Sequence, residues 1–164
     1  ESAGTEFEAL LQRLRPRVEV FLKASTLLRF PQFAYLRANL PLRSRAAECL
    51  QYRFYPKGAP LIQHDSPIKS VSLFFLVWGT VDVVAINEAK EQVGLSTVSH
   101  GDLKPYVGEL SVFGKVAPTD TVLCRTPVHC LVLVHTEGGK FGQILPEFKD
   151  QAELTARKVR SINM

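Results

Sequence analysis

The chain has 164 residues, of which 46% are hydrophobic and 22% charged, values of a globular protein long enough to bury a core. Its net charge is +4, but the basic residues lie in stretches predicted to be helical and lack the interleaved aromatics of a nucleic-acid surface. No apolar run reaches the roughly 18 residues of a membrane span. We therefore expect neither nucleic-acid binding nor direct membrane insertion by this chain.

The first 50 residues have the pattern of helices. Apolar residues recur at spacings of three and four over 7–30, which predicts a helix, and Pro16 predicts a kink in it or a division into two shorter helices. Two shorter helices are expected over 32–39 and 41–50, the second with Pro41 in its first turn, where a missing N–H costs little.

The pattern changes at Gln51 to short strands separated by glycine and proline turns. Gly79 divides the long β-rich stretch 70–86, which suggests a bend between paired strands. About eight strands at roughly ten-residue spacing are typical of a small barrel or jelly roll. The strand segments are expected at 52–55, 60–63, 70–86, 92–98 and 122–134.

The stretch Thr136–Gly139 ends the sheet, and 141–164 returns to a helical pattern. We therefore predict an α+β fold, an eight-stranded, jelly-roll-like β-roll with N-terminal helices and C-terminal lid helices. Its parts are an N-terminal helical segment at 1–50, the β-roll at 51–136 and C-terminal helices at 137–164, which together form one domain.

The cysteines and histidines are too scattered to predict a metal site, and no cofactor is expected. The three cysteines, an odd number without a Cys-x-x-Cys pair, favour a reduced intracellular compartment over a disulfide framework. If 122–134 is one extended strand, Cys124 and Cys130 lie on the same face roughly 20 Å apart.

Three segments carry a family pattern. Tyr55-Pro56-Lys57-Gly58 with Leu61-Ile62 has the form of a glycine hairpin, Phe74–Val83 (FFLVWGTVDV) that of a strand pair, and Gly108–Val112 (GELSV) that of a phosphate-binding cassette. In this order, and from about Val18 to Ser161, the chain resembles the cyclic nucleotide-binding domain of protein kinase regulatory subunits, cyclic-nucleotide-regulated channels and bacterial transcription regulators.

The resemblance implies a β-roll that holds a cyclic nucleotide. Glu109 would accept a hydrogen bond from the ribose 2′-hydroxyl, backbone N–H groups after Gly108 would hold the cyclic phosphate, and a C-terminal helix would cap the base and transmit the signal. The ligand-binding residues it implies are Tyr106, Val107, Gly108, Glu109, Leu110, Ser111, Pro118, Thr119, Asp120, Thr121 and Val122.

The second half of the cassette departs from the family. Aligning Thr121-Val122 with the family's "[ST]-V" without gaps places Pro118 where the phosphate-binding arginine stands and Asp120 where alanine stands. A shift of the register by one places Thr119 at the arginine position instead, and neither register gives an arginine. Arg125 is expected to point elsewhere, and Lys115, a flexible point charge, does not reproduce a guanidinium fork. Asp120 would repel a phosphate at about 5 Å by about 3 kcal/mol at an effective dielectric near 20.

Two other positions also differ. His64 stands where the family has glycine before aspartate, and a positive φ there would be strained. Five residues, 103–107, separate Gly101-Asp102 from Gly108-Glu109, where many members have two. The extra length predicts either a longer surface loop or a Tyr106 that stacks on a base or plugs the pocket.

The sequence therefore predicts a regulatory domain that senses a cyclic nucleotide weakly, or a nucleoside-type ligand, and signals through its C-terminal helices. The alternative is a ligand-free member of the same fold that serves as a protein-interaction or scaffolding module. No catalytic motif is present in the sequence, so an enzyme is not expected. The partners expected are a small nucleotide-like ligand and a protein bound through the helices, in an intracellular, cytoplasmic location, or at a membrane if the chain belongs to a channel.

Overall fold

The computed structural model describes residues 2–162, so the last two residues of the predicted C-terminal helix, Asn163 and Met164, lie outside the described residues. The chain divides into two compact units, Glu1–Glu48 and Cys49–Met164. Within the described residues, no helix is both long and apolar enough to cross a membrane.

The first unit is helical. It consists of α1 (Ser2–Leu27), a 3₁₀ helix η1 (Pro31–Ala38) and α2 (Leu40–Glu48), and α2 packs against α1. Asn39 starts α2 because its Oδ1 accepts the N–H of Leu42 at 3.1 Å. Pro16 lies inside α1 without ending it, so the predicted division into two helices is wrong. One lost N–H bond is tolerated where the flanking turns continue the helix.

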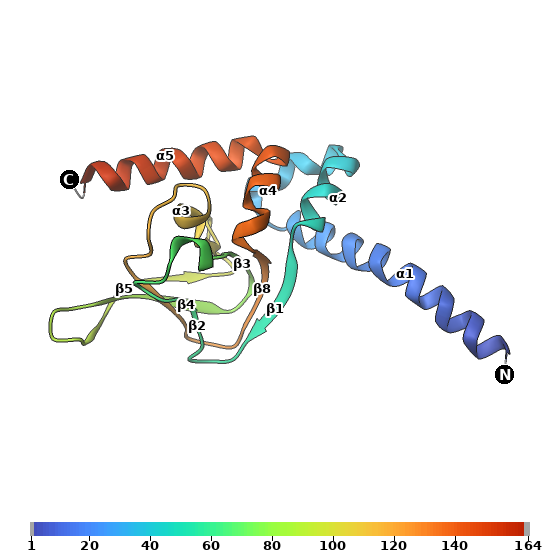
Figure 1. The fold of residues 1–164 in the computed structure, drawn as a ribbon, viewed down its shortest axis with the longest axis horizontal. Coiled ribbons are helices and arrows are strands. Elements are labelled where there is room, and N and C mark those ends of the chain that lie inside the picture. Colours follow the sequence, from blue (N-terminus) through green and yellow to red (C-terminus); the bar gives the residue numbers. More distant parts are fainter. Residues whose placement is uncertain (1, 163–164) are drawn as a thin grey trace. The chain divides into compact units, whose positions relative to one another are not determined.

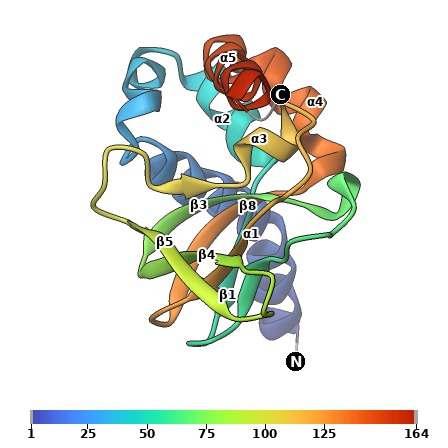
Figure 2. The same cartoon turned by 90° about the vertical axis from the view of Figure 1, so that its left-hand side faces the viewer.

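The second unit contains the β-roll, whose eight strands form two antiparallel four-stranded sheets (Figures 1 and 2). The first sheet has the order β1-β8-β3-β6 and the second the order β2-β7-β4-β5. This confirms the predicted fold class. The strands are β1 (Gln51–Tyr55), β2 (Pro60–Ile62), β3 (Leu73–Trp78), β4 (Thr80–Ile86), β5 (Gln92–Ser99), β6 (Tyr106–Val107), β7 (Thr121–Cys124) and β8 (Val128–Leu133). The short helices η2 (Ile68–Ser70) and α3 (Glu109–Val112) connect strands, and η3 (His135–Glu137) follows β8.

Alternation along the strands fills the core of the roll. Phe74 and Leu76 of β3 belong to the core cluster together with Val81 of β4 and Val122 of β7. Phe75 points to the other face of its sheet, as the period of two requires, and its ring lies 5.8 Å from that of Phe148 in the C-terminal helices.

The β region predicted over 122–134 consists of two strands, so the condition of one extended strand does not hold. The chain turns at Thr126-Pro127, and Cys124 of β7 and Cys130 of β8 lie in different sheets. Both thiols are free and buried in the same core. Burial, and secondly the charge of Cys124, raises the pKa of the Cys130 thiol to about 12. The proline interrupts the ladder where the sequence pattern appeared continuous.

Gly79 makes the bend between β3 and β4 that the sequence predicts. Its φ is +107°, and a Cβ there would lie 2.5 Å from the Pro127 carbonyl oxygen. Only glycine combines this backbone angle with such a close approach.

Two helices complete the second unit, α4 (Gly138–Ile144) and α5 (Pro146–Ile162). Pro146 separates them and starts α5 in its first turn. Phe148 of α5 packs edge-on against Phe141 of α4, with ring centroids 6.3 Å apart. From there α5 runs past α3, which it contacts (Figures 1 and 2). The C-terminal helix is therefore placed beside the cassette.

Candidate functional site

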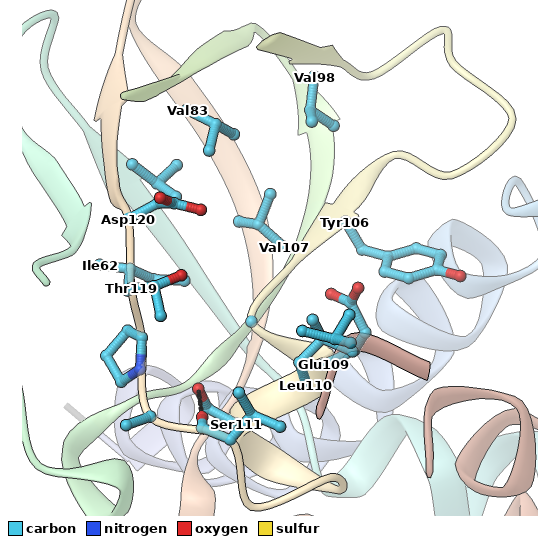
Figure 3. A pocket seen from close by; sticks show the side chains of 16 residues that line it. Ile62, Val83, Val98, Tyr106, Val107, Glu109, Leu110, Ser111, Thr119 and Asp120 are labelled. Atoms are coloured by element: carbon cyan, nitrogen blue, oxygen red, sulfur yellow. Dashed lines mark hydrogen bonds between the residues drawn. The ribbon is translucent and has the colours of Figure 1, made fainter. Parts of the chain in front are cut away.

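A pocket of about 260 Å³ opens between the β-roll and the loop that follows β6 (Figure 3). Apolar side chains from both sheets form its floor, and the loop forms its two ends. We call Gly108–Ser111 the glutamate end and Val116–Asp120 the proline end. The residues that line the pocket are Ile62, Val83, Val98, Tyr106, Val107, Gly108, Glu109, Leu110, Ser111, Val116, Ala117, Pro118, Thr119, Asp120, Val122 and Val159.

The glutamate end is fixed by its backbone. Gly108 has a φ of +98°, and a Cβ there would lie 2.2 Å from the Ser72 carbonyl oxygen. Its own carbonyl accepts the N–H of Val112 at 3.2 Å, which starts α3. These constraints direct Glu109, the first residue of α3, to the pocket wall.

Two hydrogen bonds close the loop on itself. The Ser111 hydroxyl donates to the Val116 carbonyl at 2.6 Å, and the Val116 N–H donates to the Leu110 carbonyl at 3.2 Å (Figure 3). The buried hydroxyl of Ser111 therefore binds the loop, and its role is to hold the two ends of the pocket together.

The Glu109 carboxylate is half-buried in the pocket. Burial raises the pKa of Glu109, and a backbone hydrogen bond and the charge of Lys104 partly offset this effect. Burial, and secondly the charge of Glu109, raises the pKa of the Tyr106 hydroxyl. A desolvated carboxylate accepts hydrogen bonds strongly, so Glu109 suits a ligand that offers hydroxyl groups.

The proline end has a different chemistry. Pro118 has no N–H to donate, and the half-buried Asp120 lies across the pocket from Glu109 (Figure 3). No lysine or arginine is among the residues that line the pocket in the described part of the chain. The pocket thus has a carboxylate at each end.

The two nearest cations of the loop and its strand lie elsewhere. Arg125 binds Asp82 in a bidentate pair, with distances of 2.8 Å and 3.1 Å, as the sequence predicts when it directs this side chain away from the loop. Lys115 is exposed at the turn of the loop, where its φ is +53°. Neither contributes to the pocket lining.

Of the eleven predicted site residues, the structure brings all except Thr121 together around the pocket. Thr121 is buried, and its hydroxyl accepts the N–H of His64 at 3.2 Å. The positive φ of this turn is not at His64 but at Asp65, where φ is +64°. Aspartate is one of the residues that adopt this region most readily, and His64 itself has no positive φ, so the departure from glycine at His64 carries no backbone strain.

Tyr106 is in β6 and not on an extended loop. Of the longer segment 103–107, only residues 103 and 104 are exposed, and β6 pairs with β3. The Tyr106 ring packs edge-on against Phe148 of α5 at 5.2 Å and against Phe75 at 5.9 Å. It therefore links one pocket wall to the C-terminal helix.

Six lining residues were missed from the sequence: Ile62, Val83, Val98, Val116, Ala117 and Val159. Strand alternation could have identified Val83, which faces inward two residues after Val81. Val159 comes from α5, which contacts the loop at Gly114: the Arg160 guanidinium donates to the Gly114 carbonyl, and a Cβ on Gly114 would collide with the Ala156 Cβ. No local pattern reveals that contact.

Comparison with known proteins adds the family. Residues 52–141, more than half of the chain, match the model of the cyclic nucleotide-binding domain. No curated protein sequence matches the chain.

Solved structures share the fold at low identity. The regulatory domain of Toxoplasma gondii PKA with cAMP has a TM-score of 0.70 at 13% identity, and the match covers 87% of this chain and 51% of that one. The regulatory subunit of a cAMP-independent protein kinase A from Trypanosoma brucei gives 0.70 and 17%, with 89% and 52% covered. Its counterpart from Trypanosoma cruzi, bound to guanosine, gives 0.58 and 18%, with 85% and 52% covered. The chain thus spans about half the length of these structures.

Proposed function

Because the chain belongs to the cyclic nucleotide-binding domain family, we propose that it is a regulatory domain whose pocket prefers an uncharged nucleoside to a cyclic nucleotide. The observation that carries this proposal is the pair of carboxylates, Glu109 and Asp120, at the two ends of a pocket lined by no cation among the described residues. The proposed role is binding, not catalysis.

The glutamate end supports ribose recognition. Glu109 stands at the family's ribose-binding position, and its half-buried carboxylate accepts hydroxyl donors. The valines of the floor, Val83, Val98 and Val122, offer an apolar surface to a ring. At about 260 Å³, the pocket lies near the lower bound of about 300 Å³ for ligand sites, which favours a small ligand.

The proline end disfavours the cyclic phosphate. A missing buried charge partner costs about 2–5 kcal/mol, or roughly 30- to several-thousand-fold in affinity. The Asp120 carboxylate adds repulsion that an uncharged nucleoside does not meet. A cyclic nucleotide can therefore bind only weakly, whereas a nucleoside keeps its favourable contact with Glu109.

The similar solved structures include one bound to a nucleoside and others bound to cAMP. One structure is of a kinase regulatory subunit described as cAMP-independent and bound to guanosine. A triple mutant of the Trypanosoma brucei protein, in which one threonine becomes arginine, is bound to cAMP in its A site. In that mutant a glutamate and a valine also become alanine, so a gained cation and a lost acid together accompany cAMP binding in that protein.

We propose that α5 transmits the signal. Val159 lines the pocket, and Ala156 and Arg160 hold Gly114 at the turn of the loop. A ligand that moves Val159 or the loop changes these contacts together. Hydrogen exchange measured along 146–162 with and without bound nucleoside tests this step, and unchanged exchange rates contradict it.

Calorimetric titration with adenosine, guanosine, inosine, cAMP and cGMP tests the ligand preference. We expect each nucleoside to bind at least about 10-fold more tightly than the cyclic nucleotide of the same base, because only the latter meets the Asp120 charge. Tighter binding of cAMP or cGMP contradicts the proposal. Absence of any binding below millimolar concentration contradicts it too and leaves a ligand-free interaction module.

Glu109→Gln tests the ribose contact. Removing the charge from one hydrogen bond should weaken nucleoside binding by roughly 10-fold, since a bond to a charged group contributes about 1.5–3 kcal/mol and a neutral one less. Glu88→Gln makes the same chemical change at an exposed turn and serves as the matched control. Equal affinities for the two variants would exclude a contact between Glu109 and the ligand.

A further inference from the structure

Helix α1 carries an exposed apolar row that the ligand site does not use. Its members are separated alternately by four and three residues, and each is between 42% and 63% exposed. Leu10 and Leu22 flank the row and are about half exposed. We call Phe7, Leu11, Leu14, Val18 and Phe21 the α1 seam.

The alternating spacing is that of a coiled coil. Its mean of 3.5 residues matches the a and d positions of a heptad, with Phe7, Leu14 and Phe21 at d and Leu11 and Val18 at a. Pro16 falls at position f, on the side of the helix opposite the seam. The helix-breaking residue therefore does not interrupt the face that a second helix would contact.

The charges of α1 are unequally distributed along its length. Glu6 and Glu8 precede Leu11, whereas Arg13, Arg15 and Arg17 surround Leu14. A parallel, in-register pair of identical helices would bring the arginine-rich turns of both copies to the same level along the pair, where their like charges repel. An antiparallel pair avoids this repulsion.

We propose that the α1 seam is the interface of an antiparallel coiled-coil dimer of two copies of this chain. In the register centred between Leu11 and Leu14, Leu11 faces Leu14 of the partner subunit. Phe7 then faces Val18 of the partner subunit, so the a and d positions of the two helices alternate.

The same register explains the flanking charges. Glu8 and Arg15 both occupy e positions, which meet across an antiparallel pair, so Glu8 lies beside Arg15 of the partner subunit, and the two-fold axis repeats the contact. Within its own helix, Arg15 pairs with Glu19 at 3.3 Å, but both side chains are exposed and such a pair is weak. Arg15 can therefore exchange this partner on dimerisation. One heptad further along, the register would place Arg15 beside Arg15 of the partner subunit.

Sedimentation equilibrium of the full 164-residue chain, over a range from micromolar to millimolar concentration, tests the dimer. Leu14→Asp should raise the dissociation constant about 100-fold or more, because it buries an unpaired charge on each side of the interface. Gln12→Asp places the same charge outside the seam and should leave the mass distribution unchanged. A monomer at all concentrations, or a dimer insensitive to Leu14→Asp, overturns the proposal.

A charge exchange leaves the apolar seam intact and tests the orientation. Glu8→Arg alone and Arg15→Glu alone should each weaken self-association, whereas a mixture of the two variants should form a heterodimer, because every contact in it is then between opposite charges. The double variant should also restore the homodimer. If neither the mixture nor the double variant associates better than the single variants, the antiparallel register is wrong.

Discussion

The glutamate end and the proline end of the pocket lie in one loop, yet different interactions hold them. At the glutamate end, the backbone of Gly108 lies against Ser72, and the Ser111 hydroxyl closes the loop on Val116. At the proline end, Thr119 is exposed and Pro118 and Asp120 are half-buried. Packing against the roll therefore restrains the first end more than the second.

This difference shows how one binding fold can change its ligand. Side chains that also support the roll cannot be replaced without a cost in stability, whereas side chains that only face the pocket are free to change. Phosphate recognition depends on such side chains. The family pattern is therefore preserved at the glutamate end and lost at Pro118 and Asp120, and three predictions test whether this comparison is right.

The largest effect is expected from restoring the phosphate site. Pro118→Arg with Asp120→Ala supplies a guanidinium fork and removes the like charge, so cAMP affinity should increase by about 100-fold or more, the range for a buried charge partner. Titration calorimetry of the double variant measures the change. Nucleoside affinity should change much less, because Glu109 is untouched.

The control for this gain is Pro118→Lys with Asp120→Ala. A lysine restores the charge but not the bidentate geometry, so its gain should be smaller. If the arginine variant folds normally and binds cAMP no better than the natural chain, the proline end is not what limits phosphate binding.

The second-largest expected effect is a loss of stability when the backbone restraint at the glutamate end is disturbed. Gly108→Ala forces a Cβ to within 2.2 Å of the Ser72 carbonyl oxygen at a φ of +98°, so the free energy of unfolding should fall by roughly 2–4 kcal/mol. Urea denaturation measures the loss.

Gly94→Ala is the matched substitution in β5. No heavy atom lies within 4 Å of its Cβ position, and no positive φ is required there. It should therefore be neutral or slightly stabilising, by up to about 1 kcal/mol. Equal stabilities for the two alanine variants would mean that the glutamate end is no more restrained than an exposed strand.

The sequence predicts those parts of the fold that depend on interactions between neighbouring residues, and it misses those that depend on distant ones. The bend at Gly79 and the order of helices and strands are local, and the sequence predicts them. The two-residue strand β6 is too short to show a periodic pattern. The division of 122–134 into β7 and β8 was missed because Val128–Leu133 continues the apolar pattern across Pro127.

The candidate site shows the same limit. The motif brings Glu109 and Pro118 into one loop, so their common pocket follows from the chain order once the family pattern is recognised. Val159 reaches the pocket only because the Gly114 backbone meets Ala156 on α5. Contacts between segments more than 40 residues apart have no counterpart in a local pattern, so Val159 could not be identified from the sequence.

The smallest expected effect is the change in the free energy of unfolding caused by Glu109→Gln, which separates the role of Glu109 in ligand binding from its role in stability. Because burial raises the pKa of its carboxyl in the folded chain, the charged form destabilises the ligand-free protein. Glu109→Gln should therefore raise the free energy of unfolding at pH 7 by on the order of a few tenths of a kcal/mol. Below the ordinary value of 4.5, the carboxyl is neutral in both the folded and the unfolded chain, and the difference from the natural protein should vanish.

The sign of this difference is the informative quantity. As the pH rises from 4.5 through the raised pKa, the natural chain loses stability relative to Glu109→Gln, whereas Glu88→Gln should show no such growing advantage. Thermal unfolding of the natural chain, Glu109→Gln and Glu88→Gln across this pH range measures the difference in stability. A glutamine variant that is more stable yet binds nucleoside more weakly would show that the carboxylate is kept for its ligand. A variant less stable at pH 7 would instead show that the charged carboxylate supports the fold, and its retention would then need no ligand.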